Sequence, residues 1–110
     1  MAKETRYERT RAYQTLRRDL LDDLESRGLV SEIYTDSVER YMDLWVLHQQ
    51  AKQDIRTQGL RVQDGRGAMV ENRMISLALQ TSKEMRALYA DLGFKDIALR
   101  GGAGAVDDEL

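Results

Sequence analysis

The sequence contains no cysteine and no proline, and few of its residues are aromatic. Without cysteine, disulfides, thiolate metal sites and cysteine nucleophiles are excluded, and a reducing cytoplasm is the expected location. Typical usage would supply about five prolines in a chain of this length. Because proline is the strongest helix breaker, its absence predicts a mainly helical chain. No run of about 18 apolar residues is present, so we expect no membrane span.

The chain has 110 residues, enough for one domain at most. Its charged residues are segregated along the sequence. Residues 1–18 carry six cations against two acids, and residues 19–50 carry eight acids against two arginines. Residues 51–100 are again net basic, and the last ten residues carry a net charge of −3. A basic head, an acidic middle and an acidic tip are typical of interaction surfaces. Taken alone, such runs also occur on solvated faces.

The first helix is expected over residues 6–27, with Thr5 and Glu8 forming a capping box at its start. Tyr13, Leu16, Leu20 and Leu24 recur every three or four residues and mark one buried stripe. Towards the N-terminus the stripe continues into arginines, so residues 1–12 are expected to project as a basic arm. The arm and the adjoining helix give the candidate DNA-phosphate contacts, with strong salt dependence. They are Lys3, Arg6, Arg9, Arg11, Arg17 and Arg18.

The second helix is expected over residues 37–58, capped by Asp36 or Thr35. Its centre, residues 41–47, is apolar around most of its circumference, so either other helices surround it or a second subunit covers it. We favour the second subunit. The predicted oligomer interface consists of Tyr41, Leu44, Trp45, Leu47, Val62 and Met69.

Residues 60–63 and 68–71 are expected to pair as a hairpin, 60–71, whose turn contains Gly65 and Gly67 with positive φ angles. Strands this short are not stable alone, so the hairpin must pack on something, such as a neighbouring protomer. The third helix is expected over residues 73–92, with Asn72 as its cap. Its apolar stripe is Met74, Ala78, Met85, Leu88 or Tyr89, and Leu92.

All three helices are followed by glycine with the apolar spacing of a Schellman motif, at Gly28, Gly59 and Gly93. The helices and hairpin form an expected oligomerisation domain over residues 13–94. Residues 95–110 are a glycine-rich acidic tail, expected to be flexible. The acids near its end are candidate partner-binding residues, namely Asp107, Asp108 and Glu109.

The sequence offers no convincing catalytic or metal-binding set. His48 is the only histidine, and no serine or second ligand stands at a useful spacing from it. Asp36, Glu39 and Asp43 share a helix face, but Arg40 lies beside them, which favours a solvated acidic stripe over a metal site. We therefore expect no enzyme activity, no metal and no cofactor.

The order of these motifs resembles the small subunit of phage terminases, in the branch with a hairpin between two long helices. The carrying pattern is Tyr41-x-x-Leu-Trp-x-Leu, then Gly59-Leu-x-Val, a glycine turn, Val70-x-Asn, and a helix ending Leu92-Gly-Phe. The chain departs from the family at Asn72-Arg73, where Asn-Pro is usual, and in lacking the usual Pro/Ser/Arg-containing C-terminal segment.

The resemblance implies a homo-oligomeric ring in the host cell cytoplasm that acts in viral DNA packaging. Such a subunit binds double-stranded viral DNA at the packaging start and recruits or stimulates the terminase large subunit, which carries the ATPase and nuclease activities. Two alternatives stay open at this point. One is a small helical DNA-binding dimer, a transcriptional regulator or antitoxin-like protein with twofold symmetry. The other is a helical protein–protein adaptor that binds no nucleic acid.

Overall fold

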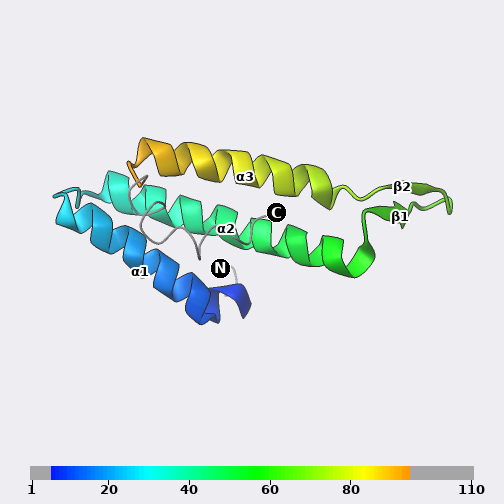
Figure 1. The fold of residues 1–110 in the computed structure, drawn as a ribbon, viewed down its shortest axis with the longest axis horizontal. Helices are drawn as coiled ribbons and strands as arrows, with labels where there is room; N and C mark the ends of the chain where they lie inside the picture. The colour runs from blue at the N-terminus through cyan, green and yellow to red at the C-terminus, as the bar shows by residue number, and fades with distance from the viewer. Residues whose placement is uncertain (1–5, 95–110) are drawn as a thin grey trace.

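A computed structural model of the chain describes residues 6–94, and these form three long helices with a hairpin between the second and third. The molecule is elongated, with extents of 55 × 34 × 23 Å (Figure 1). The predicted mainly helical architecture is confirmed. The elements are η1 (Arg6–Arg9), α1 (Arg11–Ser26), α2 (Glu32–Gln58), β1 (Arg61–Gln63), β2 (Met69–Glu71) and α3 (Met74–Asp91).

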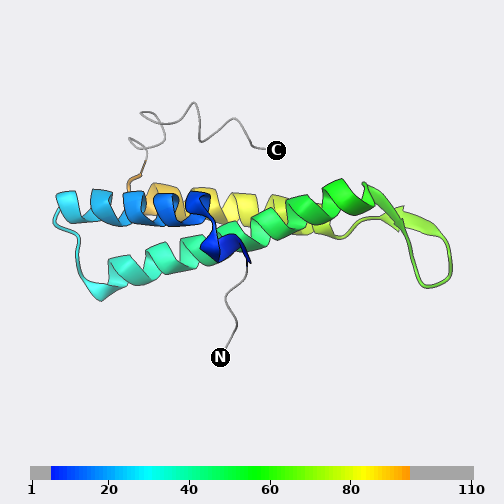
Figure 2. The same cartoon turned by 90° about the horizontal axis from the view of Figure 1, so that it is seen from below.

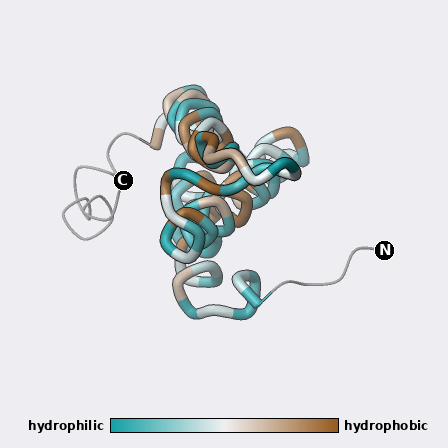
Figure 3. The backbone as a smooth tube through the Cα atoms, turned by 90° about the vertical axis from the view of Figure 1, so that its right-hand side faces the viewer, coloured by the Kyte–Doolittle hydropathy of each residue, from teal (hydrophilic) through white to brown (hydrophobic). Residues whose placement is uncertain are grey.

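The central element is α2, which packs against α3 along its length and against α1 over its N-terminal half (Figures 1 and 2). Tyr13, Leu16, Leu20 and Leu24 of α1 all face this core, as their spacing predicted. Seen from the hairpin end, hydrophobic and hydrophilic segments alternate along the helices, as expected for amphipathic elements (Figure 3). The buried core is Leu20, Leu24, Val38, Tyr41, Met42, Leu92 and Phe94. Helices of the same chain therefore cover much of the apolar surface of α2.

The first helix is not continuous from residue 6, which corrects the prediction. A 3₁₀ turn ends at Arg9, and Thr10 is extended, with φ −76° and ψ 155°. The Thr10 hydroxyl accepts from Tyr13 N at 3.2 Å and donates to Tyr7 O at 2.7 Å. A threonine hydroxyl that caps locally competes with helix propagation, so α1 starts after Thr10. The predicted capping box involves Thr5, which lies outside the described residues.

The second helix starts five residues earlier than predicted, at Glu32, and follows Ser31. Neither Thr35 nor Asp36 acts as its cap. The Thr35 hydroxyl donates to Glu32 O at 3.2 Å and the Ser37 hydroxyl to Ile33 O at 3.0 Å, so both side chains bond back into the helix. The 27-residue helix is therefore about 40 Å long.

Two of the three predicted Schellman endings are confirmed. Leu29 N donates to Leu24 O at 2.9 Å after α1, and Phe94 N donates to Tyr89 O at 3.0 Å after α3. The ending after α2 differs, because Gly59 has φ 90° and ψ 178° and leads directly into β1. There the single capping bond runs from Gly59 N to Ile55 O, and Leu60 is exposed instead of closing the cap.

The hairpin pairs as predicted, with Arg61 opposite Glu71, Val62 opposite Val70 and Gln63 opposite Met69. It extends beyond the end of the helices (Figures 1 and 2). Gly67 has the predicted positive φ, at 87°, whereas Gly65 does not.

Candidate nucleic-acid interface

The described part of the basic arm, residues 6–12, lies beside the middle of α2, where the ring of Tyr13 meets Trp45 edge-on at 5.8 Å between centroids. Arg6, Arg9 and Arg11 are exposed, and none of them forms an ion pair with another described residue. The Arg6 guanidinium lies over the Tyr7 ring at 5.2 Å. These three arginines are available for phosphate contacts. Lys3, also predicted as a contact, lies outside the described residues.

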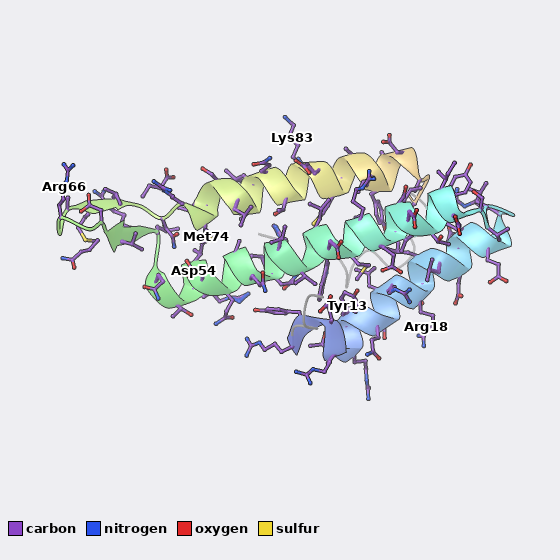
Figure 4. The ribbon with its side chains drawn as sticks, turned by 180° about the vertical axis from the view of Figure 1, so that it is seen from behind. Tyr13, Arg18, Asp54, Arg66, Met74 and Lys83 are labelled. Atoms are coloured by element: carbon purple, nitrogen blue, oxygen red, sulfur yellow. The ribbon has the colours of Figure 1, made fainter. Side chains whose placement is uncertain are left out.

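The other two predicted contacts differ from each other. Arg17 bonds to Glu39 of α2, with Nε 2.9 Å from Oε2, so this charge is already engaged in the fold. The hydrogen bond to Glu39 raises the pKa of Arg17. Arg18 points outward from α1 (Figure 4) and lies 3.9 Å from Asp19, an exposed contact of little energy.

Three carboxylates, those of Glu8, Glu39 and Asp43, lie near Tyr13 and reduce the positive electrostatic potential around the arm. Burial, followed by the charges of Glu39 and Glu8, raises the pKa of Tyr13. Burial first, and then the same two carboxylates, raise the pKa of Asp43. Within residues 6–94 no set of three or more acids, histidines or cysteines is grouped so as to hold a metal ion.

His48 is buried between α2 and α3, where its Nδ1 lies 2.9 Å from the Thr81 hydroxyl. Thr81 Oγ1 also lies within hydrogen-bonding distance of Leu77 O, at 2.9 Å, and of Ala78 O, at 3.1 Å. The histidine is a satisfied polar group in the seam between two helices.

In the part of the chain that the structure describes, no helix is long and apolar enough to cross a membrane.

Residues 14–102, most of the chain, match the family described as phage terminase, small subunit. The chain belongs to that family. The resemblance seen in the sequence is thereby confirmed, and with it a role in phage genome packaging. Neither the curated proteins nor the solved structures contain a significant match.

In this small subunit, the residues predicted to form the oligomer interface differ in exposure. Tyr41 is only 9% exposed, contacts Tyr89 at 5.8 Å between ring centroids, and has its pKa raised to about 12 by burial and then by Tyr89. Trp45 and Leu44 are half-buried, and Leu47 is 41% exposed. On the hairpin, Val62 is half-buried and Met69 is exposed, and their register places them on opposite faces. Their interface role stays a prediction.

Asn72 lies within the family pattern and does more than cap α3. Its Oδ1 accepts from Met74 N at 2.9 Å, so the predicted capping role is confirmed in geometry. Its Nδ2 donates to Asp54 Oδ2 and to Gly59 O, each at 3.0 Å. Asn72 thereby joins the end of α2, the base of the hairpin and the start of α3, where Asp54 and Met74 lie close together (Figure 4).

Arg27 joins the ends of α1 and α3, a role that was not predicted from the sequence. Its Nη2 bonds to Asp23 Oδ2 and to Leu92 O, each at 2.7 Å, and its guanidinium lies 5.6 Å from the centre of the Phe94 ring. Only one signal in the sequence pointed to it, because basic residues at a helix C-terminus often bind terminal carbonyl groups. The predicted partner-binding acids Asp107, Asp108 and Glu109 lie outside the described residues.

Proposed function

We propose that this chain is a DNA-packaging adaptor that binds double-stranded viral DNA at the packaging start and recruits or stimulates the terminase large subunit. The match of residues 14–102 to the terminase small subunit family carries this proposal. The exposed arginines of the arm, which form no ion pair with residues 6–94, support the DNA-binding part of it, because exposed guanidinium groups bind phosphate oxygens and release the counterions of DNA.

A homo-oligomeric ring would make this weak contact useful. Three arginines per chain provide modest affinity that falls steeply with salt concentration. Several arms held around one assembly act at high effective concentration, so the assembled protein binds DNA more tightly than one arm does. Leu47, Val62 and Met69 are the proposed contacts between copies; Leu47 is 41% and Met69 51% exposed, and Val62 is half-buried.

We further infer that the chain is not an enzyme. Its only histidine is buried against Thr81, and the family is a packaging subunit, so ATP hydrolysis and DNA cleavage would belong to the large subunit. The site of action would be the host cell cytoplasm, where viral DNA is packaged.

The acidic tail is the proposed docking segment for the large subunit. Asp107, Asp108 and Glu109 fit a basic surface on that partner. Deletion of residues 101–110 should reduce stimulation of the large-subunit ATPase while leaving the mass of the small-subunit assembly unchanged. Undiminished stimulation by the truncated protein would discard this docking role.

DNA binding is tested by changing Arg6, Arg9 and Arg11 together to alanine. The affinity for duplex DNA should fall, and the slope of log K against log salt should flatten by up to about three for each bound arm. Three exposed cations elsewhere, Arg40, Lys83 and Arg86, provide a control with the same loss of charge. Equal losses in the two triple variants would mean that net charge acts alone, and no binding by the wild-type protein would remove the DNA-binding function.

A further inference from the structure

The tip of the hairpin presents a single arginine between two glycines, Gly65-Arg66-Gly67. The hairpin extends past the ends of the helices, and Arg66 lies at its far end (Figure 4). Apart from its two chain neighbours, no described residue lies within 4 Å of the position that a Cβ would take on either glycine. The tip is therefore slim and open, with one long cationic side chain as its most prominent group.

The backbone of the tip is fixed by the residue before it. Asp64 Oδ1 accepts from Arg66 N at 2.8 Å and from Ala68 N at 2.9 Å. Two further bonds, Asp64 N to Ala68 O at 2.8 Å and Gly67 N to Asp64 O at 3.0 Å, close the turn. An aspartate that satisfies neighbouring amide groups in this way stabilises a defined turn. The base is fixed as well, because Asn72 joins it to α2 and α3.

The hairpin end of the molecule also carries cations that the fold does not use. Arg61, Arg66 and Arg73 are exposed, and none of them makes an ion pair with any residue in the range 6–94. At the opposite end, residues 22–36 carry five acids against one arginine. With Asp64 and Glu71 counted, residues 60–74 carry a net charge of +1. Duplex DNA would thus be repelled from the strongly acidic turn between α1 and α2, and the hairpin is the less unfavourable end.

We propose that the hairpin is a second DNA contact, in which Arg66 enters the minor groove and Arg61 and Arg73 lie against the flanking phosphates. This inference rests on the proposed DNA-binding function and adds a segment and a groove to it. The arm and the hairpin both lie away from the acidic end. Trp45, which lies beside the arm, is about 20 Å along α2 from Gln58, the last residue of that helix. The hairpin adds about 17 Å between Arg61 and Arg66, so the two contacts of one protomer would lie roughly one helical turn of the duplex apart.

The minor groove suits this tip better than the major groove does. The groove is about 6 Å wide, so it excludes a helix but admits an arginine side chain, provided that the residues flanking it are small. Narrow minor grooves of A-tracts have enhanced negative potential and attract arginine. Arginine enters more readily than lysine because its guanidinium is more weakly hydrated. The proposal therefore predicts a preference for A/T-rich duplexes that depends on Arg66.

Fluorescence anisotropy of the full chain with two 20-base-pair duplexes, one containing an A-tract and one G/C-rich, tests this at fixed salt. Wild type should bind the A-tract duplex at least about fivefold more tightly, the lower end of what one specific base-edge contact supplies. R66K should lose this preference and keep the affinity for the G/C-rich duplex. Gly65→Leu, which adds bulk but no charge, should also lose it. R86A, which removes an exposed cation from α3, is the control and should keep the preference.

The outcomes separate this inference from the proposed function. If wild type binds neither duplex, the proposed function itself fails. If wild type binds and the triple arm variant is weakened, but R66K and Gly65→Leu match wild type on both duplexes, the hairpin contact is overturned and the function stands. If R66A leaves DNA binding intact but changes the mass of the assembly, the hairpin is a contact between copies of the chain, which also overturns the proposal.

Discussion

At the scale of single residues, Asn72 and Arg27 hold the ends of the helices together through side-chain bonds to backbone groups. Asn72 is 5% exposed and uses both its amide nitrogen and its oxygen. Arg27 bonds at once to a carboxylate and to the carbonyl of Leu92. Because Asn72 is buried, its partners would carry a desolvation cost if it were lost, whereas Arg27 is exposed and contributes through its bonds alone.

Asn72→Ala should lower the free energy of unfolding by about 2–3 kcal/mol, because it removes the cap of α3 and leaves Asp54 and Gly59 O without their donor. Gln53→Ala, an exposed neighbour of Asp54, should change it little. Urea unfolding followed by circular dichroism measures both, at one protein concentration because assembly would contribute to stability. A loss below about 0.5 kcal/mol for Asn72→Ala would show that the junction is held by other contacts.

Asp43→Asn should make the protein more stable at pH 7. Burial, Glu39 and Glu8 raise the pKa of Asp43 above 3.8, so the folded chain holds this proton more tightly than the unfolded chain does. The resulting stabilisation is present below pH 3.8 and is lost as the pH rises through the raised pKa. The variant's advantage should therefore appear as the pH rises through that window and vanish below it. Asp36→Asn, on the same helix, serves as the control, and thermal melts from pH 3 to 7 provide the comparison.

At the scale of elements, the spacing of apolar residues predicted the core of α1 and α3, and glycine predicted where helices end. These signals are local, since a stripe or a cap depends on residues within one turn of each other. The predicted start of α2 was wrong because the hydroxyls of Thr35 and Ser37 can either cap a helix or hydrogen-bond back into it. The sequence does not decide between these two roles. The prediction of one continuous first helix was wrong for a related reason, because Thr10 lies inside the predicted range and caps α1 there.

The long-range contacts could not be predicted in the same way. Arg27 meets Leu92 across 65 positions of sequence, and Arg17 meets Glu39 across 22. Such pairs depend on the angle between helices, which periodicity does not fix. The arginines of the arm were found from the sequence as a group. Only the structure shows that Arg17 is ion-paired, while Arg6, Arg9 and Arg11 form no ion pair with another described residue.

Gly93→Ala should cost more stability than Gly28→Ala, although the two glycines have nearly equal φ angles of 76° and 77°. Each alanine costs about 1–2 kcal/mol for its left-handed backbone. A Cβ on Gly93 would also lie 2.7 Å from Arg27 Nη1 and would push that side chain off Leu92 O. In an Arg27→Ala background the two glycine variants should therefore cost the same. Denaturant midpoints of the six proteins, wild type included, measure this, and an unchanged difference would place the extra cost elsewhere.

At the scale of the whole molecule, one chain does not cover all of its own apolar surface. Leu47 on α2, Leu79 on α3 and Met69 and Val70 on the hairpin stay exposed. An assembly of several copies would remove such groups from water. The predicted ring is one such assembly.

Leu47→Glu should break the assembly into smaller species while leaving the helical content of the chain unchanged. Leu47 is 41% exposed in the single chain, so a glutamate there can stay in solvent until a neighbouring copy would have to bury it. Gln50→Glu adds the same charge to an exposed position of the same helix and is the matched control. Native mass spectrometry at moderate salt gives the copy number, and about eight or more copies of wild type would support the ring. A wild-type dimer, or an intact Leu47→Glu assembly, would contradict this interface.

Charge is distributed unevenly along the long axis, so the two ends of the molecule differ in electrostatic potential. Copies joined with their axes parallel would form a collar with one electronegative rim, at the α1–α2 turn, and one electropositive rim, at the hairpins. Nucleic acid would enter such a collar from one rim only, and the opposite rim would be left for a partner with a basic surface. The charge asymmetry of a single subunit would thereby decide which rim of the collar faces the DNA and which faces the large-subunit motor.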